Sequence, residues 1–266
     1  MSAAAPPATR REVAPVLPML LAQTWAQIVS YVRIPAFSLT SLALPVVFYT
    51  FFGLPNAGKH FADGTSVGLY LMCSFGAYAV SSVMVFSFGI GVATARGQKI
   101  DLLQRATPLP PGVAIVANII NALLFGLIAM LVLMTFVVLV GGVRFPVETG
   151  LQIVGLLLVG ALPLIGLGIT IGYASGPNAA PAVANLVYLP MAFASGMFVP
   201  VADLPDFIQK VAKYLPTYHY AQLAYTPVHH AAEPLGWALA WSGVWALILF
   251  ALAIRAYRRD QQRKFS

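Results

Sequence analysis

The most informative pattern in this 266-residue chain is the long spacing between its charged residues. No charged residue occurs between Arg105 and Arg144, and none occurs between Glu148 and Asp203. A transmembrane helix needs about 20 predominantly apolar residues to cross the hydrocarbon core of a bilayer. The first interval is long enough for one such helix, and the second is long enough for two. The pattern therefore predicts an all-α integral membrane protein.

Six apolar segments are candidate transmembrane helices, numbered here as spans one to six. They cover residues 34–54, 68–94, 113–141, 150–173, 180–199 and 234–257. Glycine and proline residues between spans four and five predict a tight turn. Residues 34–257 are thus expected to form a single six-span transmembrane domain. Residues 1–15 are predicted to form a disordered cytoplasmic tail. Residues 258–266 are predicted to form a basic cytoplasmic tail.

The distribution of Lys and Arg orients the spans, because cytoplasmic loops of membrane proteins are enriched in these residues. Six spans place both termini on one side of the membrane. When that side is the cytoplasm, only four of the 15 Lys and Arg residues lie outside, namely Lys59, Arg144, Lys210 and Lys213. We therefore expect a multi-pass protein of the cell inner membrane with both termini in the cytoplasm.

The composition agrees with this prediction, since 59% of the residues are hydrophobic and 9% are charged. The net charge of +7 would suit a nucleic-acid partner. However, the cations lie in short patches between apolar runs, which favours contact with the lipid bilayer and no nucleic acid. The single cysteine, Cys73, lies within span two, so neither an intrachain disulfide nor a cysteine-based metal site is predicted. No other metal site is expected.

Two segments have helical patterns but do not read as spans. Residues 16–33 place apolar side chains at intervals of three and four, opposite a polar stripe, which predicts an amphipathic helix at the cytoplasmic surface. A helix packed on other protein is the alternative. Residues 203–225 hold two short patterns interrupted by Pro216, with Asp203 and Thr217 as candidate N-caps. They predict a re-entrant pair of external half-helices between spans five and six.

The loop between spans two and three predicts a short helix from Lys99 to Ala106, followed by three prolines that stiffen its connection to span three. Arg96, Lys99 and Arg105 are expected to face anionic lipid or an acidic partner. A stiff helix tied directly to two spans is suited to receive force from a soluble protein. A plain basic loop is the alternative.

Two stretches of the chain resemble the permease subunits of type-2 ABC exporters, the ABC-2 type transporter family. In the loop, the resemblance lies in Arg96, Gly97, Leu103 and the run Thr107-Pro108-Leu109. It implies an ATPase-coupling site formed by Arg96, Gly97, Lys99, Ile100, Asp101, Leu102, Leu103, Gln104, Arg105, Thr107 and Pro108. Ala95 departs from the family pattern, which often has a glutamate at this position.

The second stretch lies at the outer end of span five. It implies an exit-region signature formed by Ser195, Gly196, Phe198, Pro200, Leu204, Pro205, Leu215 and Pro216. The resemblance further implies a second permease copy in a homodimer, with a substrate path edged by spans one, two and five. Two copies of a cytoplasmic ABC ATPase subunit would supply the energy.

We expect no cofactor in this chain and no enzymatic activity, because ATP and magnesium would be bound by the partner ATPase. Residues 53–60 approach the spelling of a phosphate-binding loop, but His60 replaces the Ser or Thr that must reach magnesium. Candidate residues of the substrate path are Asn118, Asn121, Asn185, Phe193 and Tyr218. Helix-to-helix hydrogen bonds and an aromatic belt are the alternative roles of these side chains.

Gly168, Gly172 and Gly176 recur at four-residue intervals and predict close helix packing within the subunit. An ion- or proton-coupled secondary transporter or a channel is the alternative to an exporter permease. Such proteins usually carry ionisable residues within their spans, whereas every Asp and Glu here lies outside the apolar runs. An intramembrane enzyme is disfavoured because no span contains a histidine. The cargo stays open between drugs, lipids and lipid-linked glycans.

Overall fold

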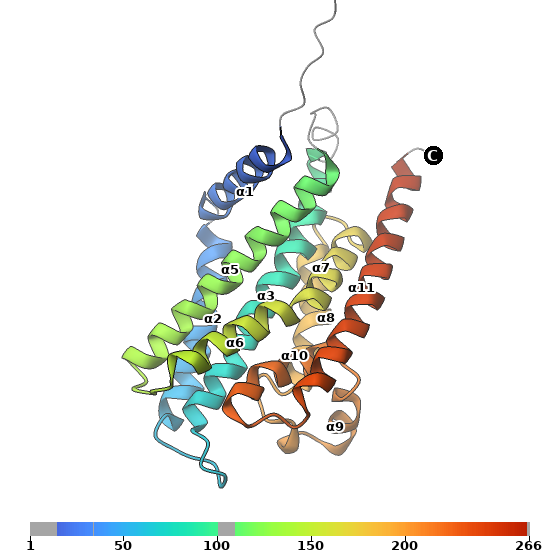
Figure 1. Ribbon diagram of the computed structural model, residues 1–266. Coiled ribbons are helices and arrows are strands. Elements are labelled where there is room, and N and C mark those ends of the chain that lie inside the picture. The colour runs from blue at the N-terminus through green and yellow to red at the C-terminus, as the bar shows by residue number, and fades with distance from the viewer. Residues whose placement is uncertain (1–14, 34, 101–109, 265–266) are drawn as a thin grey trace, which may run out of the picture.

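The computed structural model describes residues 15–33, 35–100 and 110–264 (Figure 1). Within these ranges the regular structure is helical, and the described β-pairing is an isolated bridge between His60 and Ser66. The α-helices are α1 (Val16–Arg33), α2 (Pro35–Phe48), α3 (Val67–Gly97), α5 (Pro111–Leu139), α6 (Val147–Gly160), α7 (Leu162–Ala174), α8 (Ala180–Ala194), α9 (Asp206–Ala212), α10 (Pro216–Tyr225) and α11 (Leu235–Lys264). Short π or 3-10 turns are η1 (Tyr49–Gly53), η2 (Leu54–Asn56), η3 (Val201–Asp203) and η4 (Thr226–Val228).

Four helices are long and apolar enough to cross a membrane: Val67–Gly97, Gly112–Leu139, Val147–Ala174 and Leu235–Gln262. They correspond to predicted spans two, three, four and six. The segments predicted as spans one and five correspond to shorter apolar helices, Ser41–Asn56 and Ala180–Ala194. The six-span count therefore stays a prediction, while the helical fold with several apolar membrane-length helices is confirmed.

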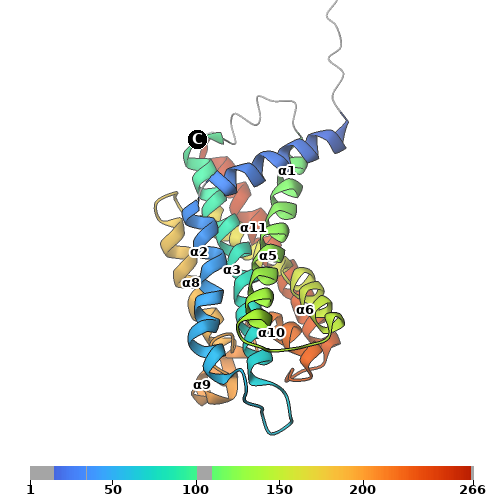
Figure 2. The ribbon, with the colours of Figure 1, turned by 90° about the vertical axis from the view of Figure 1, so that its left-hand side faces the viewer.

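Helix α3 occupies the centre of the bundle. All residues from 72 to 85 are buried, and α3 packs against α2, α5, α7, α8 and α10 (Figures 1 and 2). The central position therefore leaves no stripe of residues 72–85 facing solvent or lipid. Motion of α3 would consequently disturb most of the bundle.

The segment predicted as span four bends at Ala161. Helix α6 ends at Gly160, and α7 begins with Leu162-Pro163. Proline has no N–H to donate to the preceding turn, which accounts for the interruption. Figure 1 shows α6 running obliquely across the bundle before α7 turns toward the end that carries α1.

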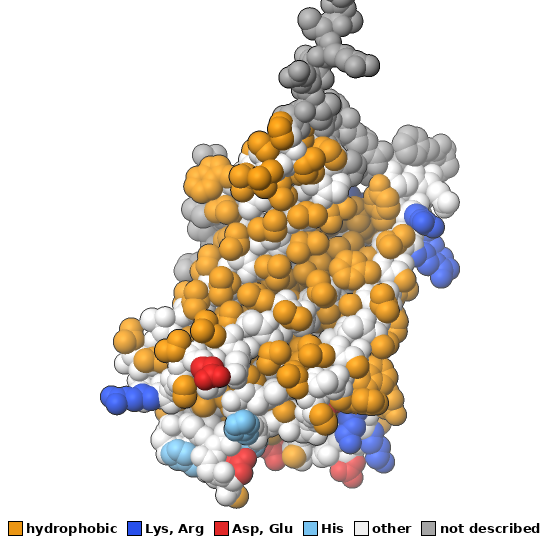
Figure 3. Space-filling model, in the orientation of Figure 1, with side chains coloured by type: hydrophobic (Ala, Val, Ile, Leu, Met, Phe, Trp, Pro, Cys, Tyr) orange, Lys and Arg blue, Asp and Glu red, His pale blue; other side chains and the backbone are white. Residues whose placement is uncertain are grey.

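The two ends of the bundle differ in what they carry. Helix α1 and the C-terminal end of α11 lie at one end, here called the basic end, and α9 lies toward the opposite end, here called the hairpin end (Figure 1). Figure 3 shows apolar side chains covering the middle of one face, with charged side chains near the two ends. Helix α11 continues to Lys264, so most of the predicted basic tail extends the last helix.

The two predicted N-caps of the hairpin are wrong. Asp203 lies in η3, and Pro205 is the residue that precedes α9. Leu215 precedes α10, whereas Thr217 lies inside that helix, with its hydroxyl 3.1 Å from the carbonyl oxygen of Met191. Proline explains the start of α10, because Pro216 at the first position has no N–H that needs a cap.

Candidate functional site

Arg96 lies in the last turn of α3 and joins three helices at the basic end. Its guanidinium donates to the carbonyl oxygens of Gly172, Tyr173 and Ser175 at 2.7, 3.3 and 3.1 Å. The last carbonyls of a helix have no partner within the helix and carry its negative dipole end, so a cation is well placed there. The other guanidinium nitrogen forms an ion pair with Asp260 of α11. Arg96 therefore holds the ends of α3, α7 and α11 together.

The position of Arg96 differs from the exposed one expected from the sequence. Its side chain is 20% exposed and that of Asp260 is 8% exposed. The guanidinium also lies 5.4 Å from the ring centroid of Tyr173, within the range of a cation–π contact. These partners come from segments about 75 and 160 residues away in the sequence, and this is why loop composition alone suggests an outward-facing charge.

Gly97 and Lys99 shape the exit of the chain from α3. A side chain at Gly97 would place its Cβ 2.3 Å from Cγ of Pro177, so only glycine allows this close contact with the turn after α7. Lys99 has a left-handed backbone conformation with φ of 58°. Ile100 is partly exposed. The other predicted coupling residues lie outside the described residues: Asp101, Leu102, Leu103, Gln104, Arg105, Thr107 and Pro108.

The hairpin end is organised around the turn that follows α8. Ser195 donates to the carbonyl oxygen of Met191 at 2.6 Å, so its hydroxyl oxygen accepts the hydrogen bond that joins it to Thr217 of α10. Gly196 has φ of +84°, and an added Cβ would lie 2.7 Å from Cγ2 of Val201. The Ser-Gly pair thus ends α8, fixes it to α10 and reverses the chain direction. The sequence pattern did not indicate Thr217 as the partner of Ser195, because the two residues belong to different helical segments.

Tyr225 connects this turn to the central helix. Its hydroxyl donates to the carbonyl oxygen of Gly196 at 3.0 Å and lies 2.8 Å from the hydroxyl of Ser74. Because the tyrosine has one hydroxyl proton and the carbonyl can only accept, Ser74 donates to Tyr225. The Tyr225 ring stacks on Tyr70 at 4.7 Å. Helices α3 and α10 and the turn at Gly196 therefore share one buried hydrogen-bond network.

Phe198 is the centre of an aromatic cluster at the same end. Its ring contacts Phe48 of α2 at 5.3 Å, Tyr78 of α3 at 4.9 Å and Phe193 of α8 at 4.3 Å between centroids. The first two contacts are edge-on, a geometry favoured by the aromatic quadrupole. The signature phenylalanine therefore ties α2, α3 and α8 together.

The other signature residues shape the hairpin backbone. The carbonyl oxygen of Pro200 accepts from the N–H of Asp203 at 3.0 Å, and that of Leu204 accepts from the Gln209 side chain at 2.7 Å. Pro205 and Leu215 precede α9 and α10, and Pro216 is the first residue of α10. All ten residues of α10 are buried, whereas α9 is largely exposed.

The structure does not gather the five predicted path residues into one site. Asn118 and Asn121 lie on α5, Asn185 and Phe193 on α8, and Tyr218 on α10. Asn121 is fully buried and its amide has no hydrogen-bond partner among the described residues. Asn185 is exposed and donates to the carbonyl of Pro181 in its own helix. Their role in transport stays a prediction.

The glycine prediction is confirmed for two of its three residues. An added Cβ at Gly168 would lie 2.9 Å from Cβ of Phe88, and one at Gly172 would lie 2.8 Å from the Phe88 carbonyl oxygen. Gly176 has open space around it. The small residues of α7 thus allow its backbone to approach α3 within the subunit.

Comparison with known proteins agrees with this architecture. The sequence pattern of the ABC-2 type transporter matches residues 19–226, which is most of the chain. The chain belongs to the ABC-2 type transporter family. A protein of Bacillus subtilis (strain 168) named "Putative transport permease YvfS" is 27% identical over 252 residues, covering 92% of this chain and 98% of that protein. As an ABC-2 family member, the chain is a membrane transport component of a family that works with an ABC ATPase.

Proposed function

We propose that this chain is the membrane-spanning permease subunit of an ATP-driven ABC exporter, coupled to separate cytoplasmic ATPase subunits. Family membership supports the transport role, and one structural relationship supports the coupling. Helix α3 contains both Arg96 and Ser74. Arg96 lies next to predicted coupling residues 99–108. Ser74 hydrogen-bonds with Tyr225, which contacts the turn at Gly196. At 1.5 Å per residue Arg96 and Ser74 are about 33 Å apart along one rigid element.

A force applied to residues 99–108 would therefore act on the end of α3 and, through Arg96, on α7 and α11. At the other end, α3 contacts the signature through Ser74 and Tyr78. A rigid helix with fixed contacts at both ends is a physical means of relaying movement across the membrane. Opening at the hairpin end would then accompany ATPase closure at the basic end.

The proposed assembly has two permease copies and two ATPase subunits, with six spans per permease and both termini in the cytoplasm of an inner-membrane protein. The short helices Ser41–Asn56 and Ala180–Ala194 would complete spans one and five. Exposed apolar side chains on these two segments, including Phe51, Phe52 and Leu186, would then face the second copy or lipid along the substrate path. The cargo is a drug, a lipid or a lipid-linked glycan.

The distribution of acidic residues argues against the ion-coupled alternative. Asp63, Asp203 and Glu233 lie in loops or short turns at the hairpin end, Asp206 is the first residue of the short helix α9, and Glu148 lies in the first turn of α6. Asp260 is paired with Arg96 near the end of α11. Among the described residues, no carboxylate lies in the middle of a membrane-length helix, where a transported ion or proton would be held.

The test uses the permease reconstituted with its ATPase. Deleting residues 100–106, or replacing Leu103 with Asp, should abolish export while the ATPase still hydrolyses ATP and the permease retains its melting temperature. Replacing exposed Lys59 with Gln at the opposite end is the control and should leave transport unchanged. Export that survives the deletion would show that this segment does not couple the two proteins.

A further inference from the structure

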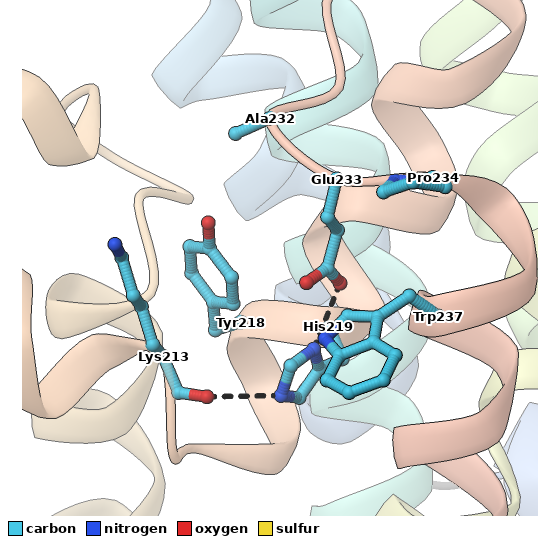
Figure 4. A pocket seen from close by; sticks show the side chains of 7 residues that line it. All are labelled: Lys213, Tyr218, His219, Ala232, Glu233, Pro234 and Trp237. Carbon is cyan, nitrogen blue, oxygen red and sulfur yellow. Dashed lines mark hydrogen bonds and ion pairs between the residues drawn. The ribbon is translucent and has the colours of Figure 1, made fainter.

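A cavity of about 350 Å³ opens at the hairpin end between α10 and the start of α11. Its lining includes Lys213, Tyr218, His219, Glu233 and Trp237 (Figure 4). The volume lies at the lower end of the range for small-ligand sites. Both signs of charge and two aromatic side chains meet here, in a part of the molecule that the coupling and exit residues do not use.

His219 fixes one wall of the cavity. Its Nε2 donates to the backbone carbonyl of Lys213 at 3.0 Å, and its Nδ1 lies 2.8 Å from one carboxylate oxygen of Glu233. The imidazole also stacks parallel to Trp241 with centroids 5.2 Å apart. His219 is therefore occupied by protein partners, and its role is to hold Glu233 in place rather than to bind a ligand.

Glu233 and Lys213 present opposite charges to the cavity. Figure 4 shows the second carboxylate oxygen of Glu233 directed away from His219, toward the side on which Tyr218 lies. Burial, and to a smaller extent the nearby Glu233 carboxylate, raises the pKa of Tyr218. The Lys213 ammonium and the Tyr218 hydroxyl point the same way in Figure 4. Lys213 makes no ion pair with any residue that the structure describes.

An apolar stripe leads from the cavity along α11. Trp237, Trp241, Val244 and Ile248 follow one another at intervals of three or four residues and therefore share a helix face. Trp237, Val244 and Ile248 are 56%, 45% and 43% exposed. Tryptophan is enriched at the level of lipid headgroups. The cavity thus lies where a lipid-facing surface meets the polar end of the molecule.

We propose that this cavity binds the headgroup of a phospholipid that carries both a phosphate and a primary ammonium, with its acyl chains along the α11 stripe. Lys213 and the Tyr218 hydroxyl would contact the phosphate. The free oxygen of Glu233 would accept a hydrogen bond from the ammonium, beside the rings of Tyr218 and Trp237. The lipid would lie in the leaflet at the hairpin end and would connect α10 to α11.

The chemistry distinguishes this ligand from other lipids. A quaternary ammonium could contact the aromatic rings but has no N–H to donate to Glu233. An anionic headgroup without an amine would bring its phosphate near the Glu233 carboxylate and would offer no N–H to the second oxygen of that carboxylate. A soluble phosphoethanolamine shares the polar contacts but lacks the acyl chains that the exposed α11 stripe would cover.

The test is native mass spectrometry of the full-length protein in detergent, with dioleoyl phosphatidylethanolamine, phosphatidylcholine or phosphatidylglycerol added separately. Phosphatidylethanolamine should bind most tightly. Lys213→Gln and Glu233→Gln should each weaken it about tenfold, the size expected for one charge-assisted contact. Lys210→Gln, at an exposed position of α9 that does not line the cavity, should bind normally.

Lys213→Gln keeps the backbone carbonyl that accepts the hydrogen bond from His219, so the wall of the cavity is unchanged. The binding affinity of this variant therefore tests the proposal even where Glu233→Gln impairs folding. Equal binding of all three lipids, or unchanged affinity in Lys213→Gln, would overturn the proposal. So would binding of soluble glycerophosphoethanolamine with the affinity of the lipid, because the site would then recognise a soluble phosphate. Retention of a copurifying protein at this site in place of lipid would also overturn it.

Discussion

The guanidinium of Arg96 at the end of α3 forms an ion pair with the carboxylate of Asp260 near the end of α11. The two residues are separated by most of the chain, yet their side chains are largely shielded from solvent. The same guanidinium donates hydrogen bonds to carbonyl oxygens at the C-terminal end of α7. Arg96 therefore connects the ends of α3, α7 and α11 at the basic end of the bundle, beside the predicted coupling segment.

Asp260→Asn should lower the free energy of unfolding by about 1–3 kcal/mol, because it removes the negative charge that pairs with a shielded arginine. Arg96→Lys should also destabilise, since an ammonium cannot reproduce the planar fork that reaches Asp260 and the α7 carbonyls together. Thermal unfolding in detergent would measure both changes. Arg255→Gln, at an exposed position of α11, is the control. An unaltered melting temperature in Asp260→Asn would show that the pair contributes nothing to stability.

Gly172→Ala should destabilise the protein by about 1–3 kcal/mol, because a methyl group would overpack a tight helix contact. The new Cβ would lie 2.8 Å from both the carbonyl oxygen of Phe88 and Cβ of Val92. Gly176→Ala has no atom within 4 Å of the new Cβ and should have little effect. Melting temperatures of the two variants provide the comparison. Equal destabilisation by both would contradict the packing explanation.

Gly196→Ala should cost about 1–3 kcal/mol, since a non-glycine residue is strained at this positive φ. Its Cβ would also overlap Cγ2 of Val201. Adding Val201→Ala should restore only part of the loss, because it relieves the overlap but not the backbone strain. Gly155→Ala, on α6 with open space around it, should be neutral or slightly stabilising. Full recovery in the double variant would show that strain is unimportant. The measurement is thermal unfolding of the unaltered protein, the two single variants and the double variant.

Tyr225→Phe should destabilise by about 1–3 kcal/mol, because it leaves the buried carbonyl of Gly196 and the hydroxyl of Ser74 without their partner. Ser74→Ala should cost less, since Tyr225 keeps its bond to Gly196. A double-mutant cycle measures the coupling between the two hydroxyls. Additive effects would show that the hydroxyls at 2.8 Å do not interact energetically.

Much of the fold followed from local pattern. The apolar runs predicted the helices, and Pro216 predicted the break between α9 and α10. The glycine repeat predicted close helix packing within the subunit, although the pattern could neither identify α3 as the partner of α7 nor exclude Gly176. The hairpin caps were wrong because Pro205 and Leu215 precede the two helices, and only the tertiary structure shows that the Thr217 hydroxyl contacts Ser195 at the end of α8.

The sequence by itself determined that the chain is helical and lies in a membrane, because apolar length and charge spacing are properties of the linear chain. It also indicated the loop and turn that carry the family signatures. Only the tertiary structure decided which side chains meet: Arg96 with Asp260, Ser195 with Thr217, and Glu233 with His219. These contacts join residues 164, 22 and 14 positions apart, so the packing of the helices brings them together. Local periodicity carries no information about such partners.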